Sequence, residues 1–261
     1  MDPVVIRFGP LTVHWYGVFI VLAMVLGIYL AARRGLRERV EPEVFYDLLP
    51  WIIVGGVAGA RLLFVVTYWE QNFSGRPWWH VVAVWEGGLV FHGGLAGAAV
   101  AVVGFARRRR LPLWVLADAL APSLAAGHVL GRMGCLMNGC CYGRPTAVAW
   151  AVRFPLEHET HGVAVHPTQL YEAGLNLCLY LGLAALYRRK QFDGQVFAAY
   201  LIGYAVLRAG VEFFRGDYPN VVGGWMTPGH WTSLVVLGVG VGLYYRLPRV
   251  LARRGGPGAE G

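Results

Sequence analysis

Three polar side chains stand at helical spacing in one apolar stretch, and among them an arginine could bind an anion. Tyr204, Arg208 and Glu212 follow one another at intervals of four residues, so on a helix they would share one face. An ionisable group within an apolar segment is costly and is therefore a candidate for function. Glu212 would then hold the guanidinium of Arg208 in place. A purely structural ion pair explains the same spacing, and the spacing alone does not separate the two interpretations.

Two more arginines stand within or at the rim of apolar segments. Arg132 follows His128 by four residues. Arg61 lies deeper in another segment, where Asp118 would be its partner if its role were structural. A guanidinium is planar, binds phosphate oxygens bidentately and stays charged at any accessible pH. We therefore expect Arg132 and Arg208 to bind an anionic headgroup, most simply that of a phospholipid.

A histidine and a group of glycines open another apolar run at residues 91–97. His92 could act as a general base, because imidazole titrates near neutrality. The glycines after it would let another backbone or a lipid headgroup approach closely. A lone histidine in a membrane helix more often makes a hydrogen bond between helices, and the sequence alone favours that interpretation for His92.

The four cysteines could form a metal site, a disulfide or neither. Cys135, Cys140 and Cys141 stand at C-x4-C-C spacing, with three histidines downstream at 158, 161 and 166. This spacing matches none of the usual zinc patterns, so we expect no metal. If the segment lies outside the cell membrane, a disulfide from Cys135 to Cys140 or Cys141 becomes plausible. Cys178 falls in an apolar span, where we expect it to serve packing.

The composition indicates a membrane protein. Of the 261 residues, 56% are hydrophobic and 15% are charged, and the mean hydropathy is +0.48. A soluble domain carries about 25% charged residues. The 36 glycines and the abundant Trp and Tyr fit membrane helices with aromatic residues at the interface. These figures exclude a disordered chain, a collagen, a coiled coil and a small disulfide scaffold.

Seven apolar segments are long enough to cross a bilayer as helices. They lie at about 13–32, 47–68, 88–106, 112–131, 167–187, 194–214 and 228–246. Fifteen of the 23 Lys and Arg residues follow alternate segments, against five in the other loops, so the basic loops are expected in the cytoplasm. We predict a single all-α polytopic membrane domain over 1–261, with seven transmembrane helices, an outside N-terminus and a cytoplasmic C-terminus. The basic charge reports topology and gives no support to nucleic-acid binding.

Two segments on the predicted outer side are longer than a connection needs. Residues 69–87 carry four tryptophans and are expected to form an arm at headgroup level. Residues 132–166 are expected to form an extracytoplasmic head loop near the chemistry. The first residues have no basic region and no cleavage site, so we expect no removable signal peptide. The tail at 253–261 is expected to be disordered.

The sequence resembles the bacterial prolipoprotein diacylglyceryl transferases along most of its length. The resemblance begins with His-Trp-Tyr-Gly at 14–17 and continues with His-Gly-Gly-Leu at 92–95. It is carried further by GRMGCLMNGCCYG at 131–143, HPTQLYE at 166–172 and RAGVEFFR at 208–215. Each stretch alone is moderately specific, whereas the set in this order on seven predicted spans is highly specific.

The resemblance implies an alkyl transfer in the bacterial cytoplasmic (inner) membrane. The diacylglyceryl group of phosphatidylglycerol passes to the lipobox cysteine of a preprolipoprotein, a thioether forms, and glycerol phosphate leaves. Arg132 and Arg208 match the family's essential arginines, and with His92 they are the expected catalytic residues. The expected substrate-binding residues are Tyr16, Arg132, Asn138, Gly143, His166, Tyr204, Arg208 and Glu212.

The chemistry of this reaction agrees with that assignment. Two fixed guanidiniums would stabilise the negative charge that grows on the departing phosphate. His92 is the titratable group best suited to accept the thiol proton. The reaction needs no metal and no organic cofactor, and the expected partners are phosphatidylglycerol, preprolipoproteins and the bilayer.

The signature stretch also departs from the family pattern. An asparagine usually stands where Cys135 stands, and a glutamate usually stands near Cys140, whereas Asn138 is retained. A divergent relative with another nucleophile or lipid stays open. So do two further functions: an anion or lipid transporter that uses the intramembrane arginines, and a membrane thiol oxidoreductase built on the cysteines.

Overall fold

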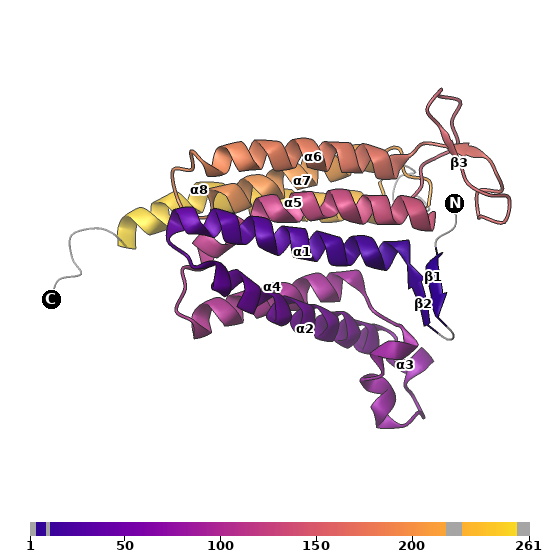
Figure 1. Ribbon diagram of the computed structural model, residues 1–261, viewed down its shortest axis with the longest axis horizontal. Coiled ribbons are helices and arrows are strands. Elements are labelled where there is room, and N and C mark those ends of the chain that lie inside the picture. The colour runs from indigo at the N-terminus through magenta and orange to yellow at the C-terminus, as the bar shows by residue number, and fades with distance from the viewer. Residues whose placement is uncertain (1–3, 9–10, 218–225, 255–261) are drawn as a thin grey trace. The chain divides into compact units, whose positions relative to one another are not determined.

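The computed structural model describes residues 4–8, 11–217 and 226–254, and its main elements are helices (Figure 1). A long helix lies at each segment predicted to be an apolar span. These helices are α1 (Trp15–Gly35), α2 (Pro42–Thr67), α4 (Phe91–Arg108), α5 (Leu113–Asn138), α6 (Thr168–Tyr187), α7 (Gln195–Glu212) and α8 (Pro228–Arg254). In the described part of the chain, four of them, α1, α2, α5 and α6, are long and apolar enough to cross a membrane. The helical membrane fold is confirmed at this level, while seven crossings and their orientation stay predictions.

Short elements connect the long helices. They are the strands β1 (Val4–Phe8), β2 (Leu11–His14), β3 (Val152–Arg153) and β4 (Ala164–Val165), the helix α3 (Trp69–Asn72), and the 3-10 turns η1 (Leu36–Glu38), η2 (Trp78–Val81) and η3 (Val84–Glu86). The strands form two antiparallel pairs, β1 with β2 and β3 with β4. The sequence analysis missed these pairs, because strands of two to five residues carry too short a pattern. Most of the tail predicted to be disordered lies outside the described residues.

Helix α5 is longer at its carboxyl end than predicted. The predicted span ends at 131, but the helix continues to Asn138, so that Arg132 and Cys135 are helical. Gly139 then has a φ of +76°, a left-handed conformation that glycine adopts readily and that ends many helices. The predicted head loop of 132–166 is therefore helical in its first part.

The chain divides into two compact units, which are described separately here. The large unit consists of residues 1–31 and 117–261, and the small unit consists of residues 32–116. We predicted a single domain over 1–261, and this stays a prediction, because a division into compact units does not test it.

Helices α2 and α4 of the small unit pack through glycines. A Cβ atom on Gly97 would overlap the carbonyl of Gly55, and one on Gly93 would overlap the carbonyl of Gly59. Small residues four apart allow such close approach of helices in membrane proteins. Glycines of the run that opens α4 therefore serve helix packing, which is one of the two uses expected for them.

Arg61 of α2 holds the arm at 69–87 by backbone hydrogen bonds. Its Nε donates to the carbonyl of Val81 at 2.9 Å, and its Nη1 donates to the carbonyl of Gly87 at 2.6 Å. Its Nη2 also donates to the carbonyl of His80. The side chain is buried, and carbonyl oxygens satisfy its donors in place of a carboxylate.

Asp118, the partner suggested for Arg61, has other partners. Its carboxylate accepts hydrogen bonds from the amides of Gly194 and Phe197 at 2.8 and 2.9 Å, and from Lys190 Nζ at 3.3 Å. The suggested Arg61–Asp118 pair is therefore wrong. Asp118 instead holds the start of α7 to α5.

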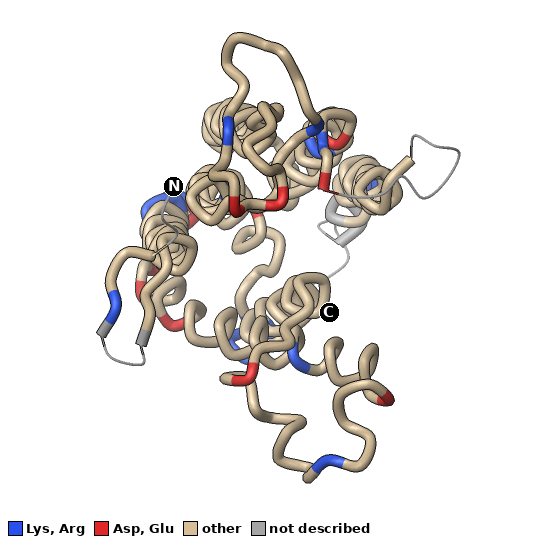
Figure 2. The backbone as a smooth tube through the Cα atoms, turned by 90° about the vertical axis from the view of Figure 1, so that its right-hand side faces the viewer, with Lys and Arg blue, Asp and Glu red and all other residues tan. Residues whose placement is uncertain are grey.

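In the large unit, α7 contacts both α6 and α8, and the segment with β3 extends beyond the end of α6 (Figure 1). Gly134 brings α5 against α1, since a Cβ atom there would lie 3.2 Å from Cβ of Phe19. Most of the backbone in Figure 2 is tan, because charged residues are only 15% of the chain. The few charges buried in this unit are therefore the natural place to look for a site.

Candidate functional site

Two arginines of the large unit are paired with buried carboxylates. Arg132 on α5 donates from Nη2 to Oε1 of Glu172 on α6 at 2.7 Å. Arg208 on α7 donates to Oε2 of Glu212, one helical turn further on. Both carboxylate side chains are almost fully buried, whereas each arginine side chain keeps 15% of its surface exposed. Each guanidinium is thus held by a buried carboxylate, on a side chain that keeps part of its surface exposed.

Tyr204 connects the two pairs. Its hydroxyl interacts electrostatically with Arg132, Arg208 and Glu172. His128 stacks on the Tyr204 ring with the centroids 4.8 Å apart, and its Nε2 is 3.1 Å from the hydroxyl of Tyr200. The predicted face of Tyr204, Arg208 and Glu212 is therefore part of a polar cluster that also contains Arg132.

Residues at the start of α8 position Glu212 from behind. Thr227 donates from its hydroxyl to Oε1 of Glu212, and that hydroxyl lies 3.1 Å from Nδ1 of the buried His230. A Cβ atom on Gly229 would overlap the Glu212 carboxylate. Glu212 therefore has little freedom to move, and it restrains Arg208 in turn.

Gly143 and His166 lie together at the base of the head loop. The amide of Gly143 donates to the carbonyl of His166 at 2.9 Å, and a Cβ atom on Gly143 would overlap His166 and lie 2.8 Å from the carbonyl of Phe214. Nδ1 of His166 is 3.0 Å from the hydroxyl of Tyr171. In this structure Gly143 allows three chain segments to approach, and His166 orients the Tyr171 side chain.

Tyr16 and Asn138 lie near Arg132 and the cysteines. Tyr16, in the first turn of α1, interacts electrostatically with Arg132 and Cys135. Asn138 is the exposed last residue of α5, and its side chain influences the electrostatics of the Cys140 thiol. Both predicted residues therefore join the site of the large unit.

His92 is an exposed residue in the first turn of α4, in the small unit. The other predicted site residues belong to the large unit. The assignment of His92 as general base stays a prediction.

The cysteines are free thiols in the structure, so the disulfide considered for Cys135 is not formed. The thiols of Cys135 and Cys140 make hydrogen bonds with Cys141 and, with the guanidiniums of Arg215 and Arg132, hold the pKa of the Cys141 thiol below its ordinary value. Cys141 therefore bears more thiolate character than a free cysteine.

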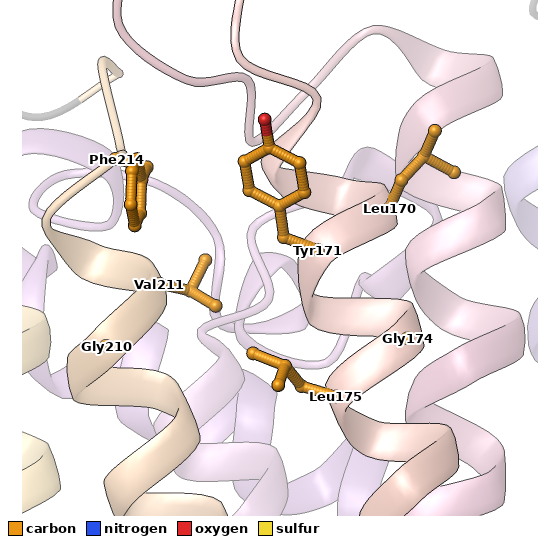
Figure 3. A pocket seen from close by; sticks show the side chains of 7 residues that line it. All are labelled: Leu170, Tyr171, Gly174, Leu175, Gly210, Val211 and Phe214. Carbon is orange, nitrogen blue, oxygen red and sulfur yellow. The ribbon is translucent and has the colours of Figure 1, made fainter. Parts of the chain in front are cut away.

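An apolar groove of about 450 Å³ lies between α6 and α7. Its lining residues come from both helices and from the turn after α7, and they are Leu170, Tyr171, Gly174, Leu175, Gly210, Val211 and Phe214. In Figure 3 the rings of Tyr171 and Phe214 lie at the upper end, edge to face with their centroids 5.8 Å apart, and the Tyr171 hydroxyl points toward the loops above. Gly174 and Gly210 leave the walls open, because nothing lies within 4 Å of a Cβ atom added at either position.

Several residues of this site were missed by the sequence analysis. They are Glu172, then Thr168 and Gln169, which donate hydrogen bonds to the carbonyls of Cys141 and Cys140, and finally Thr227 and Gly229. The first three stand in the HPTQLYE stretch, so the signal was present in the sequence. The sequence alone did not show which residue each of them contacts, because these contacts join different parts of the chain.

The comparisons with known proteins agree with the resemblance stated above. Residues 3–246 match the family described as "Prolipoprotein diacylglyceryl transferase". A protein of Synechococcus elongatus is 35% identical over 92% of this chain and 85% of its own length. One of Bordetella bronchiseptica is 36% identical over 94% of both chains, and one of Gloeobacter violaceus is 36% identical over 98% of this chain and 96% of its own length. All three are named phosphatidylglycerol–prolipoprotein diacylglyceryl transferase.

Proposed function

The chain belongs to the prolipoprotein diacylglyceryl transferase family, and from that premise we propose how its polar cluster carries out the transfer. The protein is a multi-pass membrane transferase that moves the diacylglyceryl group of phosphatidylglycerol to a prolipoprotein. The acceptor is the thiol of the lipobox cysteine, and the products are a thioether and glycerol phosphate.

The observation that carries this proposal is the pair of restrained guanidiniums around Tyr204. Arg132 and Arg208 are each held by a buried carboxylate and each keep an exposed part. A guanidinium fixed in this way can act on charge that develops in the transition state without first reorganising. The phosphate of the lipid is the group on which that charge develops.

The reaction breaks one carbon–oxygen bond and forms one carbon–sulfur bond. The thiol sulfur attacks the glyceryl carbon, and the electron pair of the broken bond stays on the phosphate oxygen. Arg132 and Arg208 stabilise this oxygen anion more than they stabilise the intact lipid, which lowers the barrier. The thiol proton leaves to a base, for which His92 remains our candidate.

The groove between α6 and α7 is proposed to hold one acyl chain of the lipid. Its walls are apolar side chains, and Val211 in one wall directly precedes Glu212 of the polar cluster. A Gly210→Leu substitution would place a side chain in the open wall. We expect it to slow turnover of long-chain phosphatidylglycerol more than that of a short-chain analogue. Equal slowing of both would contradict this placement of the chain.

The orientation in the membrane completes the proposal. Seven crossings of the bacterial inner membrane, with the N-terminus and the head loop outside, follow from the distribution of arginines. A single cysteine at Trp78, which is 80% exposed, should react with an impermeant thiol reagent in intact cells, whereas one at Arg108 should not. Labelling at position 108 from outside would overturn the orientation.

The transporter alternative depended in part on Arg61, whose donors are used by the arm. To test the transfer, purified protein is incubated with phosphatidylglycerol and a lipobox peptide, and the peptide is analysed by mass spectrometry. The expected result is a diacylglyceryl thioether on the peptide cysteine. No product under conditions in which a relative is active, or a covalent lipid on the enzyme's own cysteines, would refute the proposed direct transfer.

A further inference from the structure

We propose that Cys135, Cys140 and Cys141 form a three-thiolate site for a soft monovalent cation, with Cu(I) as its best match. The proposed transfer uses a thiol that belongs to the substrate, so these three thiols have no part in it. The site is therefore additional to the transferase reaction, and it lies next to Arg132 of the proposed active site.

The three sulfur atoms lie together although their residues belong to a helix and to the turn after it. All three Sγ atoms are within 4.8 Å of one another, and the thiol of Cys140 also lies 3.7 Å from the carbonyl of Cys135. With metal–sulfur bonds of about 2.3 Å, three sulfurs around one ion stand about 4 Å apart. The thiols therefore need to move by less than about 1 Å to enclose an ion.

The turn that carries the cysteines is held rigidly by its neighbours. The carbonyl of Cys140 accepts a hydrogen bond from Gln169 Nε2 at 2.8 Å, and the carbonyl of Cys141 accepts one from the Thr168 hydroxyl at 2.6 Å. Cys141 has a φ of +64°, a left-handed conformation that costs free energy for a residue with a side chain. Surrounding contacts enforce this conformation, and it points the third thiol at the other two.

The number of ligands selects the ion. Among the described residues, no His, Asp or Glu belongs to the group formed by the three thiols. Structural Zn(II) sites take four protein ligands in a tetrahedral arrangement, whereas soft thiolates also select Cu(I), which three sulfurs can complete. The thiols lose their protons to solvent on binding, so the site requires no oxidant and no reductant.

The charge around the thiols fits the same ion. Three thiolates and one monovalent cation carry a net charge of −2. The guanidiniums of Arg132 and Arg215 both interact electrostatically with Cys141. Each guanidinium is also paired with a carboxylate, Arg132 with Glu172 and Arg215 with Asp217, so the two cations would offset only part of the charge of the Cu(I) complex.

The test is a competition titration of the full-length protein in detergent. Reduced protein is mixed with Cu(I) and a colorimetric Cu(I) chelator under anaerobic conditions. We expect one equivalent of Cu(I) to transfer to the protein, with the ultraviolet absorption of a thiolate complex. A Cys140→Ser variant should lose about a hundredfold or more in affinity, because even loss of an outer-shell partner costs ten- to a hundredfold. Cys178→Ser is the matched control and should bind as the wild type does, since Cys178 is exposed on α6.

A second measurement uses the wild-type protein alone and so does not depend on the folding of a variant. Cu(I) should protect Cys135, Cys140 and Cys141 from alkylation by N-ethylmaleimide, as read by mass spectrometry, and should leave Cys178 reactive. Equal alkylation with and without Cu(I), or unchanged affinity in Cys140→Ser, would overturn the site. Tighter binding of Zn(II) than of Cu(I) would overturn the choice of ion.

Discussion

Replacing Glu172 by glutamine removes the charge that restrains Arg132. The substitution should lower the thermal stability of the protein, and phosphatidylglycerol should restore part of that stability. The Glu172 carboxylate is 1% exposed and lies 2.7 Å from Arg132. Removing one partner of a buried ion pair costs about 3–5 kcal/mol, because the other charge stays buried without compensation. Arg132 keeps 15% of its surface exposed, so we expect the lower end, about 3 kcal/mol.

The assay is thermal unfolding in detergent micelles with and without phosphatidylglycerol. A loss of about 3 kcal/mol corresponds to a decrease in melting temperature of roughly 6–12 °C for a chain of this size. Phosphatidylglycerol should restore more of the melting temperature in Glu172→Gln than it adds to the wild type. The physical reason is that its phosphate supplies the negative charge that the variant lacks. Diacylglycerol, which has the same acyl chains but no phosphate, should restore less.

The chain offers a matched control for this substitution. Arg109 and Asp47 form an ion pair at the same distance of 2.7 Å, but both side chains are about half exposed. Asp47→Asn should therefore change the free energy of unfolding by at most about 1 kcal/mol, with no dependence on phosphatidylglycerol. If Glu172→Gln loses no more than this control, or if both lipids restore it equally, the proposed binding of phosphate by Arg132 is refuted.

Two further substitutions test how the structure positions its functional side chains. Gly229→Ala should displace the Glu212 carboxylate and lower turnover by about tenfold to a hundredfold, because misplacing a positioning group by 1 Å can cost about a hundredfold. Gly238→Ala, whose added Cβ meets nothing within 4 Å, should be tolerated, and equal turnover in the two variants would contradict the role given to Gly229. Arg61→Gln should release the arm at 69–87, which limited proteolysis would detect as new cleavage there, and protection equal to that of the wild type would argue against Arg61 as its anchor.

The long helices could be predicted from the sequence because each depends on a local property. Apolar runs of about 20 residues and arginines at alternate ends specified where helices lie to within a few residues. The end of α5 was missed because hydropathy decreases at Arg132, while the backbone stays helical until Gly139 adopts a left-handed conformation. Polarity predicts where a span leaves the membrane and not where a helix ends.

The two ion pairs of the site differ in whether they could be predicted, because one lies within a single helix and the other joins two helices. Arg208 and Glu212 lie one turn apart on α7, so their contact follows from helical geometry and was predicted. Arg132 and Glu172 lie on different helices, and their contact depends on how α5 packs against α6. The wrong partner suggested for Arg61 has the same origin, because carbonyl groups of a folded arm leave no signal in the sequence.

The central claim is that the planar guanidiniums of Arg132 and Arg208 stabilise the departing phosphate. The most direct measurement is the turnover of the Arg132→Lys and Arg208→Lys variants with phosphatidylglycerol and a lipobox peptide, after folding is verified by size-exclusion chromatography. Lysine keeps the charge but lacks the fork, and the loss of one preorganised donor costs about a hundredfold or more in rate. We predict a decrease of that size in both variants. Turnover close to that of the wild type in either variant would contradict the claim for that arginine and leave it a purely structural partner of its carboxylate.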